Sequence, residues 1–252
     1  MDELDTMVRT NLPYWFSKIR DAGVPVPKTV ICDSHLDSGI YKEGEDRPGL
    51  SELVEAICEA GRSLGVLPPY FLRTGHTSAK HNWSSTCFLP SLDPVVVRNH
   101  VLSLCDYSET CGILGLPASV WVVREFLPAT PLFRCVNYEN FPVVREFRLF
   151  ARDGVVLYGN PYWPEGAVRD GVPDVADWKE RLAKASVLTP AETAVLIDLA
   201  SKASTAVGGC WSVDILDTNR GWFVTDMAVA ERSYGWDHGI SDPTLSRLQN
   251  PS

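Results

Sequence analysis

Cationic side chains in two segments of the chain have the types and spacing needed to bind phosphate. Arg73 ends a short β-type run and Lys80 follows in a polar loop, while Arg148 stands in the apolar segment 143–151. Phosphate recognition needs fixed positive charge together with donors that can fold over the oxygens. Two alternatives stay open: the loop cations are ordinary solvated side chains, or Arg148 forms a simple ion pair with Glu146 on an edge strand.

Two carboxylates further along the chain have the spacing expected of a metal site. Asp214 and Asp226 lie in apolar segments that predict a β-hairpin closed by the loop 217–221. In this register Val224 opposes Asp214 and Ser212 opposes Asp226. The two acids are then diagonal neighbours on one face, about 7–8 Å apart. Oxygen ligands at that separation suit Mg²⁺, which is completed by water and phosphate.

Two expectations about substitutions follow from this hairpin. Replacing Asp214 or Asp226 is expected to leave the metal-free fold intact or slightly more stable, because crowded like charges repel. Asp217, which falls in the predicted loop, is expected to tolerate substitution. The alternative for both acids is that they are solvated side chains near a turn.

The composition argues against several other kinds of protein. The sequence contains no GxGxxG, GxxxxGK[ST] or HExxH motif, which disfavours a Rossmann site, a P-loop and a zinc peptidase. Seven scattered cysteines without a CxxC pair indicate thiols rather than disulfides or structural zinc. A formal charge of −9 disfavours nucleic-acid binding, because an acidic surface repels a phosphate backbone.

Local patterns predict the elements that position these residues. Helical spacing of apolar residues and capping signals predict helices at 12–22, 50–64, 94–104 and 190–206. Alternating or β-branched runs predict strands at 26–32, 70–73, 119–127, 143–151, 155–158, 211–216 and 222–227. Antiparallel hairpins interleaved with helices are typical of an α+β fold.

The length and hydropathy of the chain predict a globular protein. With 252 residues and 45% hydrophobic content it can bury a substantial core. No apolar run approaches the roughly 18 residues that a membrane span needs. The first residues are acidic, unlike a secretory signal, so we expect a cytoplasmic protein without a membrane partner.

Taken in order, these segments resemble the ATP-grasp superfamily and, within it, the clade named for two arginines and a lysine, which is common in bacterial and phage genomes. The resemblance covers roughly residues 70–236. It implies that Arg148 and Lys80 are catalytic. It also implies cofactor-binding roles for Arg73, Lys80, Arg124, Glu125, Phe126, Leu127 and Arg148, the four residues 124–127 forming the strand beside the adenine.

The same resemblance implies that Asp214 and Asp226 bind the metal. In the family pattern the metal strand carries an acid, one further residue and then asparagine. Here Asp226 is followed by Met227 and Ala228, so the amide ligand is missing. We expect Glu231 to compensate as a third metal ligand, or one metal site to be weakened.

The resemblance further implies an α+β fold of antiparallel sheets and helices, with the nucleotide held between two lobes. We expect a small N-terminal cap at 1–68, an ATP-grasp nucleotide-binding and catalytic region at 69–241, and a disordered tail at 242–252. The implied cofactors are ATP and Mg²⁺.

The implied activity is that of an ATP-dependent ligase that joins a carboxylate to an amine through an acyl phosphate. Its partners would be small molecules, or peptide or protein substrates. Two alternatives remain: an ATP-binding assembly factor with little turnover, favoured by Ala228, and a phosphotransferase on the same scaffold.

Overall fold

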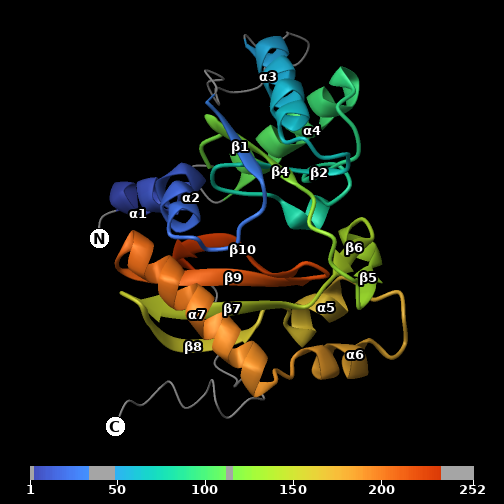
Figure 1. The fold of residues 1–252 in the computed structure, drawn as a ribbon. Helices are drawn as coiled ribbons and strands as arrows, with labels where there is room; N and C mark the ends of the chain where they lie inside the picture. Colours follow the sequence, from blue (N-terminus) through green and yellow to red (C-terminus); the bar gives the residue numbers. More distant parts are fainter. Residues whose placement is uncertain (1–2, 34–48, 112–115, 234–252) are drawn as a thin grey trace. The chain divides into compact units, whose positions relative to one another are not determined.

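The computed structural model describes residues 3–33, 49–111 and 116–233. The chain forms two compact units (Figure 1). Unit 1 comprises Met1–Val26, Leu127–Asn137 and Pro142–Ser252, and unit 2 comprises Pro27–Phe126 and Tyr138–Phe141. The predicted tail at 242–252 lies outside the described residues, and the functional boundaries expected at 68 and 241 stay predictions.

Unit 2 is a four-stranded antiparallel sheet with the order β1-β4-β2-β3. Its elements are β1 (Thr29–Asp33), α3 (Leu50–Ser63), β2 (Tyr70–Thr74), the 3-10 helix η1 (Lys80–Asn82), β3 (Phe88–Leu89), α4 (Pro94–Thr110) and β4 (Val120–Glu125). Leu72 and Trp121 of the sheet and Ile57 and Leu104 of the helices are fully buried in a shared core. Asp93 caps α4, as predicted, by accepting a hydrogen bond from the Val95 amide at 2.8 Å.

Unit 1 is built on a second four-stranded antiparallel sheet, with the order β10-β9-β7-β8. Its strands are β7 (Glu146–Arg152), β8 (Val155–Pro161), β9 (Cys210–Thr218) and β10 (Gly221–Val229). Strand β5 (Phe133–Cys135) pairs with β6 (Phe141–Val143), whose first residue belongs to unit 2. Its helices are α1 (Glu3–Thr10), α2 (Leu12–Asp21), α5 (Glu165–Asp170), α6 (Trp178–Ala185), α7 (Pro190–Val207) and η3 (Ala230–Arg232), together with η2 (Val136–Tyr138), whose last residue belongs to unit 2.

One face of the unit 1 sheet is apolar and lies against α7. Phe147 and Ile215, which point to this face, are fully buried, and Figure 1 shows α7 crossing the strands. The predicted capping box starts this helix. The Thr189 hydroxyl accepts from the Glu192 amide at 3.2 Å, and the Glu192 carboxylate accepts from the Thr189 amide at 2.8 Å.

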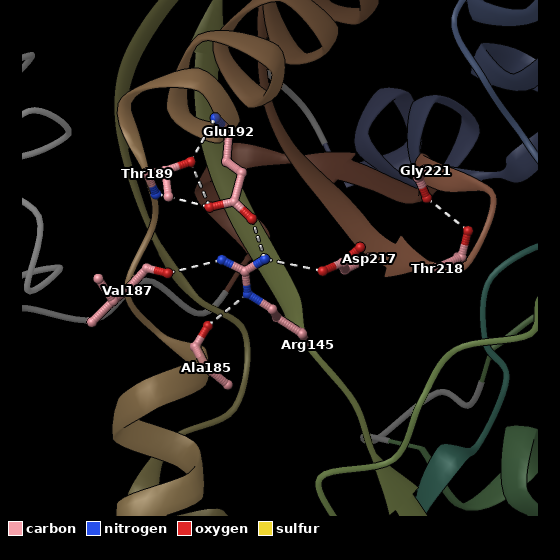
Figure 2. A network of polar contacts seen from close by, with 8 residues as sticks. All are labelled: Arg145, Ala185, Val187, Thr189, Glu192, Asp217, Thr218 and Gly221. Atoms are coloured by element: carbon pink, nitrogen blue, oxygen red, sulfur yellow. Dashed lines mark hydrogen bonds and ion pairs between the residues drawn. The ribbon is translucent and has the colours of Figure 1, made fainter.

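The strand predicted over 143–151 is interrupted, because β6 ends at Val143 and β7 begins at Glu146. Arg145 lies between them, and its side chain bonds to α7 and its neighbours (Figure 2). The guanidinium donates to the carbonyls of Ala185 and Val187 at 2.9 and 2.8 Å. It also pairs with Glu192 at 2.6 Å and with Asp217 at 3.0 Å. Arg145 is therefore a structural clamp within unit 1.

Two further sequence-based expectations can be compared with the described residues. Each of the seven cysteines is a thiol rather than half of a disulfide. Among residues 3–33, 49–111 and 116–233, no helix has both the length and the apolar character needed to cross a membrane.

Candidate functional site

In unit 2, the two candidate phosphate cations lie at the end of β2 and in the turn that follows it. Arg73 is 3% exposed, and its Nε donates to the Thr74 carbonyl at 3.0 Å. The Thr74 hydroxyl accepts from the Thr77 amide at 3.0 Å, which closes the base of the loop. Lys80 starts η1 directly after Ala79, whose backbone is left-handed at φ 49°. The polar loop predicted from the sequence is therefore a compact turn with its own hydrogen bonds.

Two histidines lie near these cations, and both are held in the neutral form. Burial, followed by the charge of Arg73, lowers the pKa of His76. Burial, followed by the charge of Lys80, lowers the pKa of His81. Near neutral pH the positive charge of this turn is therefore carried by Arg73 and Lys80 rather than by the two histidines.

The residues predicted to line the adenine lie at the end of β4. Arg124 and Glu125 are both buried. The Glu125 carboxylate accepts from the Lys28 amide at 2.8 Å, so this side chain holds the chain just before β1. Phe126 packs edge-on against Phe88 at 5.5 Å between ring centroids, and Leu127 is the first residue of the next unit 1 segment. Adenine binding by residues 124–127 stays a prediction.

In unit 1, Arg148 and Asp214 form a bidentate ion pair. They are directly opposed on β7 and β9, with Nε to Oδ1 at 2.6 Å and Nη2 to Oδ2 at 2.8 Å. Their side chains are 18% and 6% exposed, so the pair is largely shielded from water. The Arg148 guanidinium also lies 4.8 Å from the centre of the Tyr162 ring. Opposed residues of antiparallel strands share a face, and this face is the one turned away from α7.

The hairpin register predicted from the sequence is wrong. Strand β9 continues through Asp217 to Thr218, and Gly221 opposes Thr218, so the turn is shorter than expected. Asp217 is thus a strand residue paired with Arg145, and not a loop residue of the kind expected to tolerate substitution. Asp214 opposes Asp226 directly, instead of Val224.

A β-bulge at Thr225 brings the two acids to the same face. Between Thr218 and Val224 the pairing is regular, and continuing it would place Asp226 opposite Val213, on the apolar face. One extra residue in β10 shifts the alternation, so Asp226 turns to the face of Asp214. The prediction that these acids share a face is therefore correct, although the register that led to it is not.

The structure adds Asn160 to this face, which the sequence reasoning missed. Asn160 opposes Arg148 from β8, so Asp226, Asp214, Arg148 and Asn160 form one row across four strands. Asn160 is 3% exposed, and its Nδ2 donates to the Pro161 carbonyl at 2.9 Å. Within the described part of the chain its Oδ1 has no hydrogen-bond partner. The predicted strand ended at residue 158, which left Asn160 outside it.

The row has the donor chemistry expected of a magnesium site. Asp214 and Asp226 present carboxylate oxygens from adjacent strands, and Mg²⁺ needs only one or two carboxylates when phosphate completes its shell. Glu231 lies on η3 and is exposed. No group of three histidine, cysteine or acidic side chains in residues 3–33, 49–111 and 116–233 is arranged to hold a metal ion. The role of Glu231 stays a prediction, and the fit rests on the two aspartates.

A serine motif at the end of α3 does not form a catalytic site. The segment from Gly61 to Gly65 has the GxSxG pattern of a hydrolase nucleophile, which requires a sharp strand-to-helix turn. Here Ser63 is the last residue of α3, and its hydroxyl donates to the Ala60 carbonyl at 2.8 Å. The segment is an ordinary helix end.

With this geometry in place, the chain can be compared with known proteins. A family model for the ATP-grasp domain, family 3 of the clade named for two arginines and a lysine, matches residues 63–222. The chain belongs to this family. The match covers more than half of the 252 residues and includes Arg73, Lys80, Arg148 and Asp214, while Asp226 lies just beyond it. The predicted superfamily and the predicted α+β ATP-grasp fold are thereby confirmed.

Solved structures resemble this chain at low sequence identity. C-terminally truncated Cdc123 from Schizosaccharomyces pombe is 14% identical with a TM-score of 0.53, covering 92% of this chain and 88% of that chain. Another Cdc123 structure from that organism is 15% identical with a TM-score of 0.51, covering 94% and 90%. A RimK domain ATP-grasp protein from Sphaerobacter thermophilus is 13% identical with a TM-score of 0.46, covering 96% and 64%. A search of curated proteins found no match.

Proposed function

We propose that this ATP-grasp protein is an ATP-dependent ligase that joins a carboxylate to an amine through an acyl phosphate. The observation that carries the proposal is the row Asp226, Asp214, Arg148 and Asn160, which spans the face of the unit 1 sheet turned away from α7. In one line it offers oxygen ligands for a metal, a fixed cation and a buried amide oxygen.

The charged members of the row, together with Lys80, would each have a role in this chemistry. Asp214 and Asp226 would hold Mg²⁺, which supplies charge neutralisation for the phosphates. Arg148 would stabilise the charge on the transferring γ-phosphoryl group, and Lys80 would bind the phosphates in the ground state. Asn160 lies beyond Arg148 in the row, on the side away from the acids, and its buried Oδ1 is not assigned a role in the reaction.

The reaction has two balanced steps. A carboxylate oxygen attacks the γ-phosphorus, and the bond from that phosphorus to ADP breaks. The amine then attacks the acyl carbon, inorganic phosphate leaves, and the amine loses a proton. Phosphorylation is needed because a carboxylate is a poor electrophile, and the fixed cations oppose the negative charge that gathers on the phosphoryl group.

The proposal is tested by product analysis with the purified chain, ATP, Mg²⁺ and panels of amino acids and short peptides. A ligase releases ADP and phosphate only when an acid and an amine are both present. With hydroxylamine as the amine, it converts the activated acid to a hydroxamate. ATP binding without turnover under any of these conditions would instead support the assembly factor. A stable phosphorylated product formed without amine would support the phosphotransferase.

The assembly-factor alternative has one specific observation in its favour. Ala228 stands where the family pattern has an amide ligand, and within the described residues no group of three histidine, cysteine or acidic side chains could hold a metal ion. Weaker metal binding would slow phosphoryl transfer more than ATP binding, because the metal chiefly opposes charge that develops in the transition state.

A further inference from the structure

A four-residue segment, Tyr138–Phe141, joins unit 2 although the chain on either side of it belongs to unit 1. We call this segment the clasp. Its contacts in unit 2 converge on the turn that follows Lys80. The backbone of the clasp is unusual, because Glu139 and Asn140 have φ angles of 54° and 58°. Non-glycine residues rarely adopt this left-handed conformation, and it persists only where surrounding contacts hold it.

The Glu139 carboxylate is the polar centre of the clasp. Its Oε2 accepts from the amide and the hydroxyl of Ser84, both at 2.7 Å, and from the Ser85 amide at 3.0 Å. Its Oε1 accepts from the Ser85 hydroxyl at 3.1 Å. Partial burial alone would raise the pKa of Glu139, but these hydrogen bonds hold it below its usual value. The carboxylate therefore stays charged near neutral pH and binds the turn through charge-assisted hydrogen bonds.

Aromatic contacts flank this carboxylate on both sides. Tyr138 stacks on His81, the residue after Lys80, at 4.5 Å between ring centroids and 12° between planes. Phe141 packs edge-on against Trp83 at 5.0 Å. Three of the four clasp residues thus contact the turn between Lys80 and Ser85.

Hydrogen bonds within the turn connect these contacts to the residues beside Lys80. The Thr86 hydroxyl donates to the Ala79 carbonyl at 2.9 Å and to the Asn82 carbonyl at 2.6 Å. These carbonyls bracket η1, which begins at Lys80. A continuous set of hydrogen bonds therefore runs from Glu139 through Ser84 and Ser85 to the backbone on either side of the lysine.

We propose that Glu139 is a positioning residue for nucleotide binding, which fixes the turn carrying Lys80 before phosphate arrives. The inference rests on the phosphate role proposed for Lys80. A lysine on an unrestrained loop loses conformational freedom on binding, whereas a turn that is already held avoids most of that cost. The clasp would thus raise ATP affinity without touching the nucleotide.

A double-mutant cycle with ATP and Mg²⁺ as the probe tests this inference. Binding is measured by calorimetry for the wild type, Glu139→Ala, Lys80→Ala and the double variant. Glu139→Ala is expected to weaken ATP binding about tenfold, as expected for losing hydrogen bonds to a charged group. In the Lys80→Ala background the same change should have almost no further effect, because Glu139 acts through Lys80. The matched control, Glu59→Ala, replaces an exposed acid on α3 and should bind ATP like the wild type.

Hydrogen exchange supplies a readout that does not depend on the nucleotide. Glu139→Ala should speed exchange at the Ser84 and Ser85 amides while exchange in β2 and β4 stays slow. Glu139→Gln, which keeps one acceptor oxygen, should restore part of the protection and part of the affinity. It also serves as the test variant if Glu139→Ala does not fold.

The outcomes separate this inference from the proposed function. Wild-type affinity in Glu139→Ala, or an equal loss with and without Lys80, would overturn the positioning role and leave the proposed function standing. A wild-type protein that binds no ATP would overturn both.

Discussion

At the scale of single residues, Arg148 belongs both to the proposed phosphate chemistry and to the internal structure of the site. Its guanidinium is bonded to Asp214 through two nitrogens, so the same side chain that would meet a phosphoryl group also compensates a buried carboxylate. Asp214 and Asp226 are therefore not simply two crowded acids. The expectation that removing either one stabilises the metal-free fold does not hold for Asp214, because its substitution leaves a largely buried guanidinium without its counter-charge.

Substitution of the two aspartates should thus have different effects on the stability of the fold but the same effect on metal binding. Asp214→Asn is expected to lower the free energy of unfolding by about 1–3 kcal/mol without Mg²⁺, while Asp226→Asn changes it much less. Urea unfolding without metal measures this difference. Both variants should lose the stabilisation that Mg²⁺ adds in the presence of ATP. Asp198→Asn is the control, because Asp198 pairs with Lys202 on the exposed side of α7. Equal unfolding free energies for the two site variants would contradict the role given to the ion pair.

The ion pair of Glu192 with Arg145 should make the stability of the fold depend on pH in the acid range. The hydrogen bond from Arg145, more than any other contact, lowers the pKa of Glu192 from 4.5 to about 2. A folded-state pKa below the unfolded value gives stability that is present above pH 4.5 and is lost as pH falls towards 2. Glu192→Gln, which can keep the capping box, should therefore be less stable than the wild type near neutral pH, with the gap closing over that interval. Urea unfolding across this pH range measures the gap. A gap that stays constant with pH would rule out the charged pair as its cause.

At the scale of elements, Arg145 and Arg148 are close in sequence but serve different structures. Arg145 ties the α6–α7 connection, α7 and β9 together on the apolar side of the sheet (Figure 2). Arg148 lies on the opposite face, in the candidate site. Sequence spacing could not separate the structural arginine from the one proposed to bind phosphate.

Arg145→Lys is therefore expected to lower the stability of the fold and to leave ATP binding nearly unchanged. A lysine ammonium cannot reproduce the planar fork that reaches two carbonyls and two carboxylates at once, so the free energy of unfolding should fall by about 2 kcal/mol. The dissociation constant for ATP should change by less than about twofold, since uniform loss of stability leaves a folded site intact. Urea unfolding and calorimetry on the same sample test both parts. A selective loss of ATP affinity at wild-type stability would place Arg145 in the site instead.

At the scale of the whole molecule, the candidate residues are divided between the units. Arg73 and Lys80 belong to unit 2, whereas Arg148, Asp214 and Asp226 belong to unit 1. The family expectation that one nucleotide is held between two lobes remains a prediction, and it can be tested through ligand linkage. A ligand that binds only the native state stabilises it by about 2.7 kcal/mol at about 100 times its dissociation constant.

ATP with Mg²⁺ should accordingly raise the unfolding temperature of the wild type. Lys80→Ala in unit 2 and Asp226→Asn in unit 1 should each remove most of that rise, because each withdraws a group that is proposed to contact the phosphates or their metal. Glu59→Ala and Asp198→Asn are the matched controls in the two units. Thermal unfolding followed by circular dichroism measures the shift. If only one of the two site variants reduces it, the nucleotide does not depend on both units.

The sequence by itself determined the superfamily, the α+β class and most of the elements, because these depend on local signals. Helical spacing and a capping box specify α7, and an apolar run after two prolines specifies β2. The order of Arg73, Lys80, Arg148 and Asp214 along the chain was enough to indicate the ATP-grasp family, and the family match confirms it.

Only the tertiary structure decided which side chains share a face. The bulge at Thr225 reverses the alternation of β10, and a difference of one residue moves Asp226 between the apolar face and the site. The position of Asn160 beside Arg148 depends on the register of the β7–β8 hairpin, which shifts between Phe150 and Ala151. That of Glu139 against the turn that follows Lys80 depends on contacts between segments far apart in the chain. The hydrophobic periodicity of the sequence does not reveal such pairings, because each is fixed by strand register or by hydrogen bonds that form only when the segments meet.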